Sequence, residues 1–156
     1  HRSLYRDQAS RLTCLAAGVA AAQHGRMRGF LPYLWVFLGA GLGGAPRHGV
    51  NQAGAAVFGG GFPAATLIVN LIGCFAIGVL TSLFAFRGEW ADQHARLFLT
   101  TGVLGGFTTF SAFSLDTAVL LERGQGGLAV AYVAASVGGA LAGVFAGLFV
   151  GRAFLR

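Results

Sequence analysis

Four long stretches without a charged side chain constrain this 156-residue sequence more than any other feature. They cover 29–46, 49–86, 97–115 and 124–151, and are 18, 38, 19 and 28 residues long. An α-helix rises 1.5 Å per residue, so about 20 apolar residues cross the roughly 30 Å hydrocarbon core of a bilayer. The pattern therefore predicts an all-α membrane protein with four transmembrane helices per subunit.

The composition excludes several classes of soluble protein. Charged residues make up 10% of the chain and apolar residues 55%, whereas soluble domains carry roughly 25% charged residues. The net charge of +6 comes from arginines beside apolar runs, which is typical of membrane flanks and not of a nucleic-acid surface. A disordered chain, a basic nucleic-acid-binding protein and an ordinary soluble enzyme are therefore excluded, and lipid is an expected partner.

The first 26 residues differ from the rest. The chain begins with His1, its only methionine is Met27, and the apolar run at 12–22 is too short to span a membrane. This run could be the hydrophobic region of a signal peptide. We expect instead that residues 1–26 are a non-native or disordered N-terminal extension and that 27–156 form the transmembrane domain.

Glycine and proline divide the 38-residue stretch. Gly54, the run Gly59–Gly61 and Pro63 predict a loop near 52–62, followed by a membrane span over 63–86. Proline is tolerated in the first turn of a helix because its missing N–H would be unpaired there in any case.

Small residues recur every four positions along the last stretch. They stand at Ala131, Ala135, Gly139, Gly143, Gly147 and Gly151, and the pattern repeats at Gly39 and Gly43. Such spacing lets helix backbones approach closely in a membrane. It fits helix packing within one subunit and a dimer face equally well, so both interpretations stay open.

The third stretch contains the segment least suited to a continuous helix, GVLGGFTTFSAFS at 102–114. A glycine pair followed by hydroxyl residues is a poor helix interior. One interpretation is a packing glycine pair, with serine and threonine bonded back to the helix. Inside a membrane, backbone groups released by a break must be satisfied by protein, water or ions. We favour a third helix broken at its centre, with exposed carbonyls that could hold a small cation.

Phe110 and Phe113 follow this break, three residues apart and therefore on one helix face. Ordinary packing is the commoner role of such a pair. Ring edges are electropositive, however. Rings presented edge-on could therefore line an anion path without a buried cation that would trap the ion.

Polar side chains on the other stretches are candidate hydrogen-bond donors. Thr66 and Asn70 share one helix face, and a mid-membrane amide must be paired. This amide could hold helices together or face a dehydrated anion. Tyr132 and Ser136 repeat the spacing and add two hydroxyls. Arg47 is either an interfacial anchor or part of a positive vestibule that concentrates anions.

Three motifs, in this order, resemble the Fluc/CrcB fluoride channel family. They are GAGLGGAPRHGVN at 39–51, TLIVNLIGCFAIG at 66–78 and the highly specific TGVLGGFTTFSAFSLD at 101–116. The resemblance implies an antiparallel, dual-topology homodimer of four-helix subunits, with two fluoride pores and a central structural sodium ion. It also implies a multi-pass protein of the plasma (inner) membrane that exports fluoride passively and so lowers its cytoplasmic concentration.

The resemblance also implies roles for individual residues. The fluoride pore falls on Phe110, Phe113, Asn70, Ser111, Thr109, Thr66, Tyr132 and Ser136, with Arg47 in the vestibule. The sodium ligands would be the backbone carbonyls of Gly105 and Thr108, given by both subunits. Three positions depart from the common pattern: Ala112 where threonine is common, Asp116 where glutamate is common, and His48 where tyrosine is frequent.

Two other functions remain as alternatives. A small four-helix dimeric multidrug/proton exporter would need a titratable carboxylate in its first span, and 29–46 contains none. A scaffold without transport activity would rest on the glycine pattern alone and would leave Thr108, Thr109 and Asn70 unexplained. The sequence contains no nucleophile–base set, phosphate loop or zinc spacing, so enzyme activity is not expected.

Overall fold

The computed structural model describes residues 29–86 and 93–154. Two units are distinguished along the chain, His1–Leu34 and Trp35–Arg156. Of the first unit, only residues 29–34 are described. The extension expected at 1–26 lies outside the described residues.

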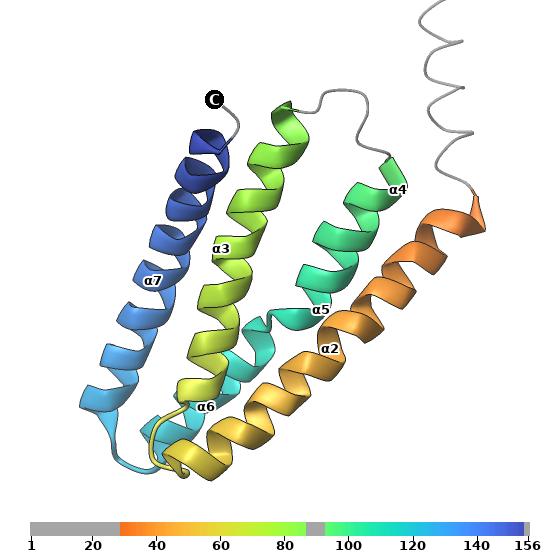
Figure 1. Ribbon diagram of the computed structural model, residues 1–156. Coiled ribbons are helices and arrows are strands. Elements are labelled where there is room, and N and C mark those ends of the chain that lie inside the picture. The colour runs from red at the N-terminus through yellow and green to blue at the C-terminus, as the bar shows by residue number, and fades with distance from the viewer. Residues whose placement is uncertain (1–28, 87–92, 155–156) are drawn as a thin grey trace, which may run out of the picture. The chain divides into compact units, whose positions relative to one another are not determined.

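The described residues are helical apart from short turns, and they contain no strand (Figure 1). The elements are α2 (Phe30–Phe58), α3 (Ala64–Phe86), α4 (Gln93–Arg96), the π-helix η2 (Leu97–Leu104), α5 (Gly105–Phe107), α6 (Phe110–Glu122) and α7 (Gly126–Ala153). By length and composition, three segments could cross a membrane: Ala64–Ala85, Gln93–Glu122 and Gly126–Ala153. An all-α protein is therefore confirmed for this part of the chain, and these segments coincide with three of the four predicted spans.

The loop predicted near 52–62 is wrong for its first part, because α2 continues to Phe58. The reason lies at Gly54, which is buried and where an added Cβ atom would collide with Ala65. This glycine lets α2 pack against the start of α3, and it does not end the helix. The turn begins only at Gly59, whose φ of +66° suits a glycine.

The glycines of the small-residue pattern lie at close helix contacts, and at three of them, Gly39, Gly43 and Gly147, the contact is with backbone atoms. An added Cβ atom at Gly147 of α7 would collide with the carbonyl oxygen of Phe75 in α3. Added Cβ atoms at Gly39 and Gly43 would collide with backbone atoms between residues 98 and 107. Of the two interpretations left open by the sequence, packing within one subunit therefore accounts for these glycines.

Replacing Gly147 with valine is expected to destabilise the protein, because the two helix backbones would have to separate. Overpacking of this kind costs roughly 1–3 kcal/mol, which should appear as a lower thermal unfolding temperature in detergent. Gly138 is a matched control on α7, because nothing lies within 4 Å of a Cβ atom added there. An equal loss in Gly138→Val would contradict the packing role of Gly147.

The buried core lies between α6 and the first half of α7. It centres on Leu120 of α6 and on Ala129 and Tyr132 of α7. Phe113 packs against this cluster from α6. Two of the predicted site residues, Phe113 and Tyr132, are therefore held by this core.

Candidate functional site

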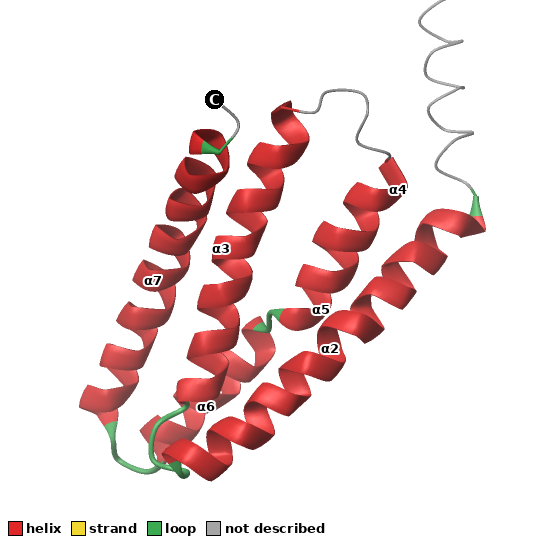
Figure 2. Ribbon diagram, viewed as in Figure 1, coloured by secondary structure: helices red, strands yellow, loops and turns green. Residues whose placement is uncertain are grey.

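The third helix is interrupted at Thr108 and Thr109. Thr108 (φ −78°, ψ 156°) and Thr109 (φ −150°, ψ 115°) have extended backbone and separate α5 from α6. Figure 2 shows this break as the loop between α5 and α6. The predicted interruption is confirmed, just after the glycine pair. Thr109 then caps α6, where its Oγ1 accepts a hydrogen bond from Ala112 N at 3.2 Å.

Asn70 of α3 satisfies both backbone groups of Thr109 at the break. Its Nδ2 donates to the Thr109 carbonyl oxygen at 3.0 Å, and its Oδ1 accepts from the Thr109 N–H at 2.8 Å. Gly73 provides the space, because a Cβ atom there would collide with Thr108. Interhelical bonding, one of the two roles open to this amide, is therefore present. An asparagine amide has two N–H donors, so this pairing does not exhaust it.

The break also releases backbone carbonyls. In an uninterrupted helix the Thr109 N–H would donate to the Gly105 carbonyl, but here it donates to Asn70. Likewise, the Ala112 N–H would donate to the Thr108 carbonyl, but it donates to Thr109 Oγ1. Carbonyls of unwound helices are known ligands of sodium. The oxygen donors released at Gly105 and Thr108 therefore fit the sodium ion that the resemblance implies.

A cavity of about 350 Å³ opens beside the break. Its lining includes five of the predicted pore residues: Asn70, Thr109, Phe110, Phe113 and Ser136. All ten residues that line it are uncharged. Ser136 Oγ is buried and makes no geometrically close hydrogen bond among the described residues, although it interacts with the Tyr132 hydroxyl. A hydroxyl has both a donor and acceptor capacity, so it can also serve a ligand in the cavity.

The two phenylalanines contact each other in the wall of this cavity. Their ring centroids lie 5.3 Å apart, with the planes inclined at 44°. Phe113 also contacts the ring of Tyr132, with centroids 5.4 Å apart. Phe113 is thus partly a packing residue, whereas Phe110 is 78% exposed. The ring of Phe110 is therefore accessible to an ion or to a partner chain.

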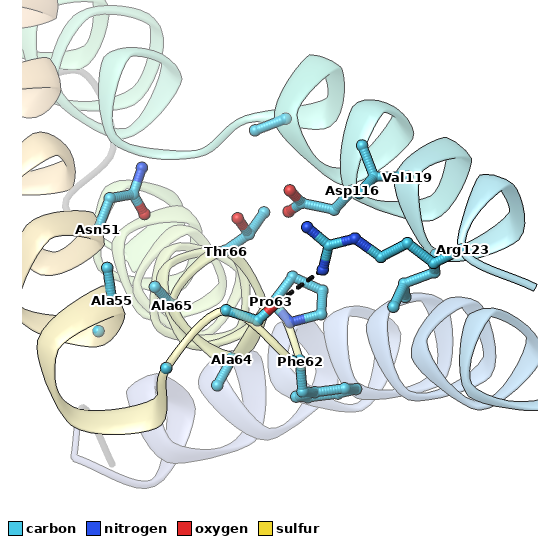
Figure 3. A pocket seen from close by; sticks show the side chains of 16 residues that line it. Asn51, Ala55, Phe62, Pro63, Ala64, Ala65, Thr66, Asp116, Val119 and Arg123 are labelled. Atoms are coloured by element: carbon cyan, nitrogen blue, oxygen red, sulfur yellow. Dashed lines mark hydrogen bonds between the residues drawn. The ribbon is translucent and has the colours of Figure 1, made fainter. Parts of the chain in front are cut away.

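Three predicted pore residues, Thr66, Tyr132 and Ser111, are not among the residues that line this cavity. Thr66 lines a second cavity of about 330 Å³, together with Asp116 and Arg123 (Figure 3). Tyr132 is fully buried, and its hydroxyl donates to Asp116 Oδ2 at 3.2 Å. Because its ring contacts Phe113, Tyr132 touches a lining residue of each cavity.

Arg47 and Ser111 line a third cavity, of about 430 Å³. Ser111 Oγ lies 3.2 Å from Thr109 Oγ1, within hydrogen-bonding distance. Thr109 lines both this cavity and the one at Phe110, and no other residue is common to the two linings. Arg47 therefore lies in a cavity that reaches the break, and its vestibule role stays a prediction.

Sequence reasoning missed three residues that line these cavities. It gave Asp116 no role beyond a departure from the family pattern, and it treated Arg123 only as a loop charge. Their spacing of seven residues, about two helical turns, could have placed them on one face. Asn51 lines both the second and the third cavity, and its Oδ1 is buried with no partner among the described residues. Asn51 ends the first of the three motifs, but no role was assigned to it from the sequence.

The chain is similar to several named proteins. A family model described as "CrcB-like protein, Camphor Resistance (CrcB)" matches residues 34–148. A Methylobacterium nodulans protein named fluoride-specific ion channel FluC is 61% identical over 104 residues, which cover 67% of this chain and 82% of the relative. Proteins of the same name from Rhodopseudomonas palustris (strain BisB5) and Granulibacter bethesdensis are each 52% identical over 107 residues, covering 69% of this chain and 86% and 84% of theirs.

Proposed function

Because the chain belongs to the CrcB family and is a multi-pass protein of the cell membrane, we propose that it is a fluoride channel. It lets fluoride leave the cytoplasm passively and thereby lowers its concentration there. The name shared by the relatives supports this function, and it denotes a channel, not an enzyme. The exporter alternative finds no support, because α2 contains no acidic residue.

The observation that carries the proposal is the uncharged cavity beside the break. Fluoride is strongly hydrated, so a pore must replace several waters at once. The Ser136 hydroxyl and the remaining N–H of Asn70 are neutral donors, and the ring edges of Phe110 and Phe113 add weak positive potential. A buried arginine would hold the anion more strongly and slow its release. The uncharged lining therefore suits permeation of fluoride better than tight binding of the ion.

The proposed path runs through the three cavities. The cavity at Phe110, which Asn70, Phe113 and Ser136 also line, meets the cavity at Arg47 and Ser111 at their shared residue Thr109. The cavity at Arg47 meets the cavity at Thr66 at Asn51, which lines both. Tyr132 is fully buried and packs against Phe113, so it forms part of the wall of the path.

The functional unit in this proposal is an antiparallel, dual-topology homodimer. Each subunit contributes four transmembrane helices. In this proposal α2, which is 29 residues long, crosses the membrane in addition to the three segments named above. Exposed apolar side chains support contact with lipid and with a second copy, because Phe110, Phe145 and Phe149 are 78%, 69% and 74% exposed. A second copy covering Phe110 would close the pore wall that one subunit leaves open.

A structural sodium ion at the dimer centre is the second part of the proposal. The carbonyls of Gly105 and Thr108 from both subunits would hold it, as the released donor set described above supports. Bound there, the ion supplies fixed positive charge where carbonyl dipoles converge.

Sodium removal is expected to weaken the dimer. A ligand present at 100 times its Kd stabilises the state that binds it by about 2.7 kcal/mol. Protein in sodium chloride should therefore unfold at a clearly higher temperature, and stay dimeric at lower concentration, than protein in N-methylglucamine chloride of equal ionic strength. Potassium chloride is the control for a general cation effect. Equal stability in all three salts would contradict the sodium site.

Fluoride efflux from proteoliposomes tests the function directly. A fluoride electrode should record release that depends on the protein, while a chloride electrode run in parallel should record retention of chloride. The proposal fails if vesicles with protein release fluoride no faster than empty vesicles.

A further inference from the structure

The second cavity, of about 330 Å³, contains both a carboxylate and a guanidinium. Figure 3 shows Asp116 and Arg123 projecting into it from α6, with Asn51 of α2 and Thr66 of α3 also directed toward it. The third cavity, at Arg47, has no acidic residue in its lining. The two cavities therefore differ in charge. The lining of the third cavity carries the positive charge of Arg47, whereas the lining of the second cavity carries the positive charge of Arg123 and the negative charge of Asp116.

The carboxylate of Asp116 lines the cavity at the Thr66 end of the proposed path. It accepts the hydroxyl hydrogen bond of Tyr132 at 3.2 Å, and Tyr132 is fully buried. In a partly dehydrated space, an unbalanced negative charge repels an anion far more strongly than it does in bulk water. A fluoride ion crossing this region needs that charge to be balanced.

Arg123 is placed to provide the balance. It is the C-cap residue of α6, seven residues after Asp116, and both residues line the same cavity. Its Nη1 donates to the Gly60 carbonyl oxygen at 2.8 Å, which holds the guanidinium at the cavity. A guanidinium is always charged and carries five N–H donors, so the single bond to Gly60 leaves both its charge and further donors for the cavity.

We propose that Arg123 is the counter-charge that lets fluoride pass Asp116 at this end of the path. The inference rests on the proposed fluoride channel function. Arg123 acts on the ion by cancelling the field of the carboxylate, so it is a positioning residue for the anion and not a tight binding site. Without Arg123 the lining keeps one net negative charge, and fluoride is rejected there.

The decisive comparison is between Arg123→Gln and the double variant Arg123→Gln with Asp116→Asn. Fluoride efflux is measured from liposomes at low ionic strength. The single variant should lose about tenfold or more in rate, the lower range of charge-steered entry, because Asp116 is left unbalanced. The double variant should recover most of this rate. Raising the salt concentration should narrow the deficit of the single variant, because salt screens the repulsion.

Arg123→Lys is the matched control for the contact with Gly60, because it keeps the charge but changes the hydrogen-bonding group. It should keep most of the flux. The inference is overturned if the double variant is as slow as the single one, since Arg123 would then act only through Gly60, or if Arg123→Gln matches the wild type. If the wild type releases no fluoride, the proposed function fails as well, so the two failures are distinguishable.

A cysteine variant that is modified after reconstitution separates the effect of the charge at position 123 from any effect of the substitution on folding. Arg123→Cys is made in a chain whose Cys14 and Cys74 are replaced with alanine, and it is reconstituted before modification. Arg123 is exposed at the end of α6, so a thiol there is open to reagents. A cationic thiol reagent should restore fluoride efflux, and a neutral reagent of similar size should not. An equal response to both reagents would overturn the inference.

Discussion

Replacing Phe110 with isoleucine is expected to reduce fluoride efflux about a hundredfold or more, equivalent to raising the barrier by roughly 2.7 kcal/mol. Isoleucine keeps an apolar side chain in the cavity wall but lacks the electropositive ring edge that a dehydrated anion can contact. Because Phe110 is 78% exposed within the subunit, the fold of the subunit depends little on it. The measurement is electrode-recorded efflux from liposomes, normalised to the amount of reconstituted dimer.

Phe145→Ile is the matched control for this change. Phe145 is similarly exposed, at 69%, and lies on α7, but it does not line the cavity beside the break. Its substitution should leave fluoride efflux close to that of the wild type. If both variants lost flux equally, or if Phe110→Ile kept its rate, the ring would have no part in permeation.

Replacing Asn70 with aspartate is expected to block fluoride efflux, by about a hundredfold or more, through two effects that add to the barrier. A carboxylate would place a negative charge in the wall of a cavity through which an anion passes. It would also lose the Nδ2 donor that bonds to the Thr109 carbonyl at 3.0 Å. An unpaired buried backbone group costs about 1–3 kcal/mol, so the unfolding temperature should fall as well.

Two controls separate these effects. Asn70→Ala removes both hydrogen bonds to Thr109 without adding charge, so it should lower stability while keeping more flux than Asn70→Asp. Gln93→Glu adds the same charge at an exposed position of α4 outside the three cavities, and it should change neither property. A fully active Asn70→Asp channel would exclude the amide from the path.

The break illustrates what the sequence could predict and what it could not. Poor helix formers between 102 and 114 indicated an interruption, and the structure contains one. Its position at Thr108 and Thr109 depends on Asn70, 39 residues earlier than Thr109, whose amide replaces the lost backbone partners. A local sequence pattern does not indicate which distant side chain will bond to the backbone groups at the interruption. The interruption was therefore predictable, and its exact residues were not.

Glycine was ambiguous for the same reason. Gly54 and Gly59 are alike in sequence, but the first allows contact with Ala65 inside a helix and the second ends the helix with a positive φ. The π-helix at Leu97–Leu104 was also not predicted, because no sequence pattern indicated it. Its backbone is the one that a Cβ atom added at Gly39 would collide with. Contacts between backbones leave no side-chain pattern to read.

The structure distributes the predicted pore residues over neighbouring cavities, and their role in a pore stays a prediction. Thr66 and Asn70 share a face of α3, as their spacing required. Four residues correspond to about 6 Å along a helix axis, and this separation is enough for the two side chains to line different cavities. Spacing therefore identified the face, whereas the division of the path depends on what Phe113 and Tyr132 fill between the cavities.

The cavities that border Thr109 have a consequence for the membrane voltage. Water that fills them shortens the low-dielectric distance that a permeating ion must cross. One elementary charge crossing the whole potential gains about 2.3 kcal/mol per 100 mV, and this work is done mainly where water does not reach. The steepness of the current–voltage relation would therefore report how far each cavity is hydrated.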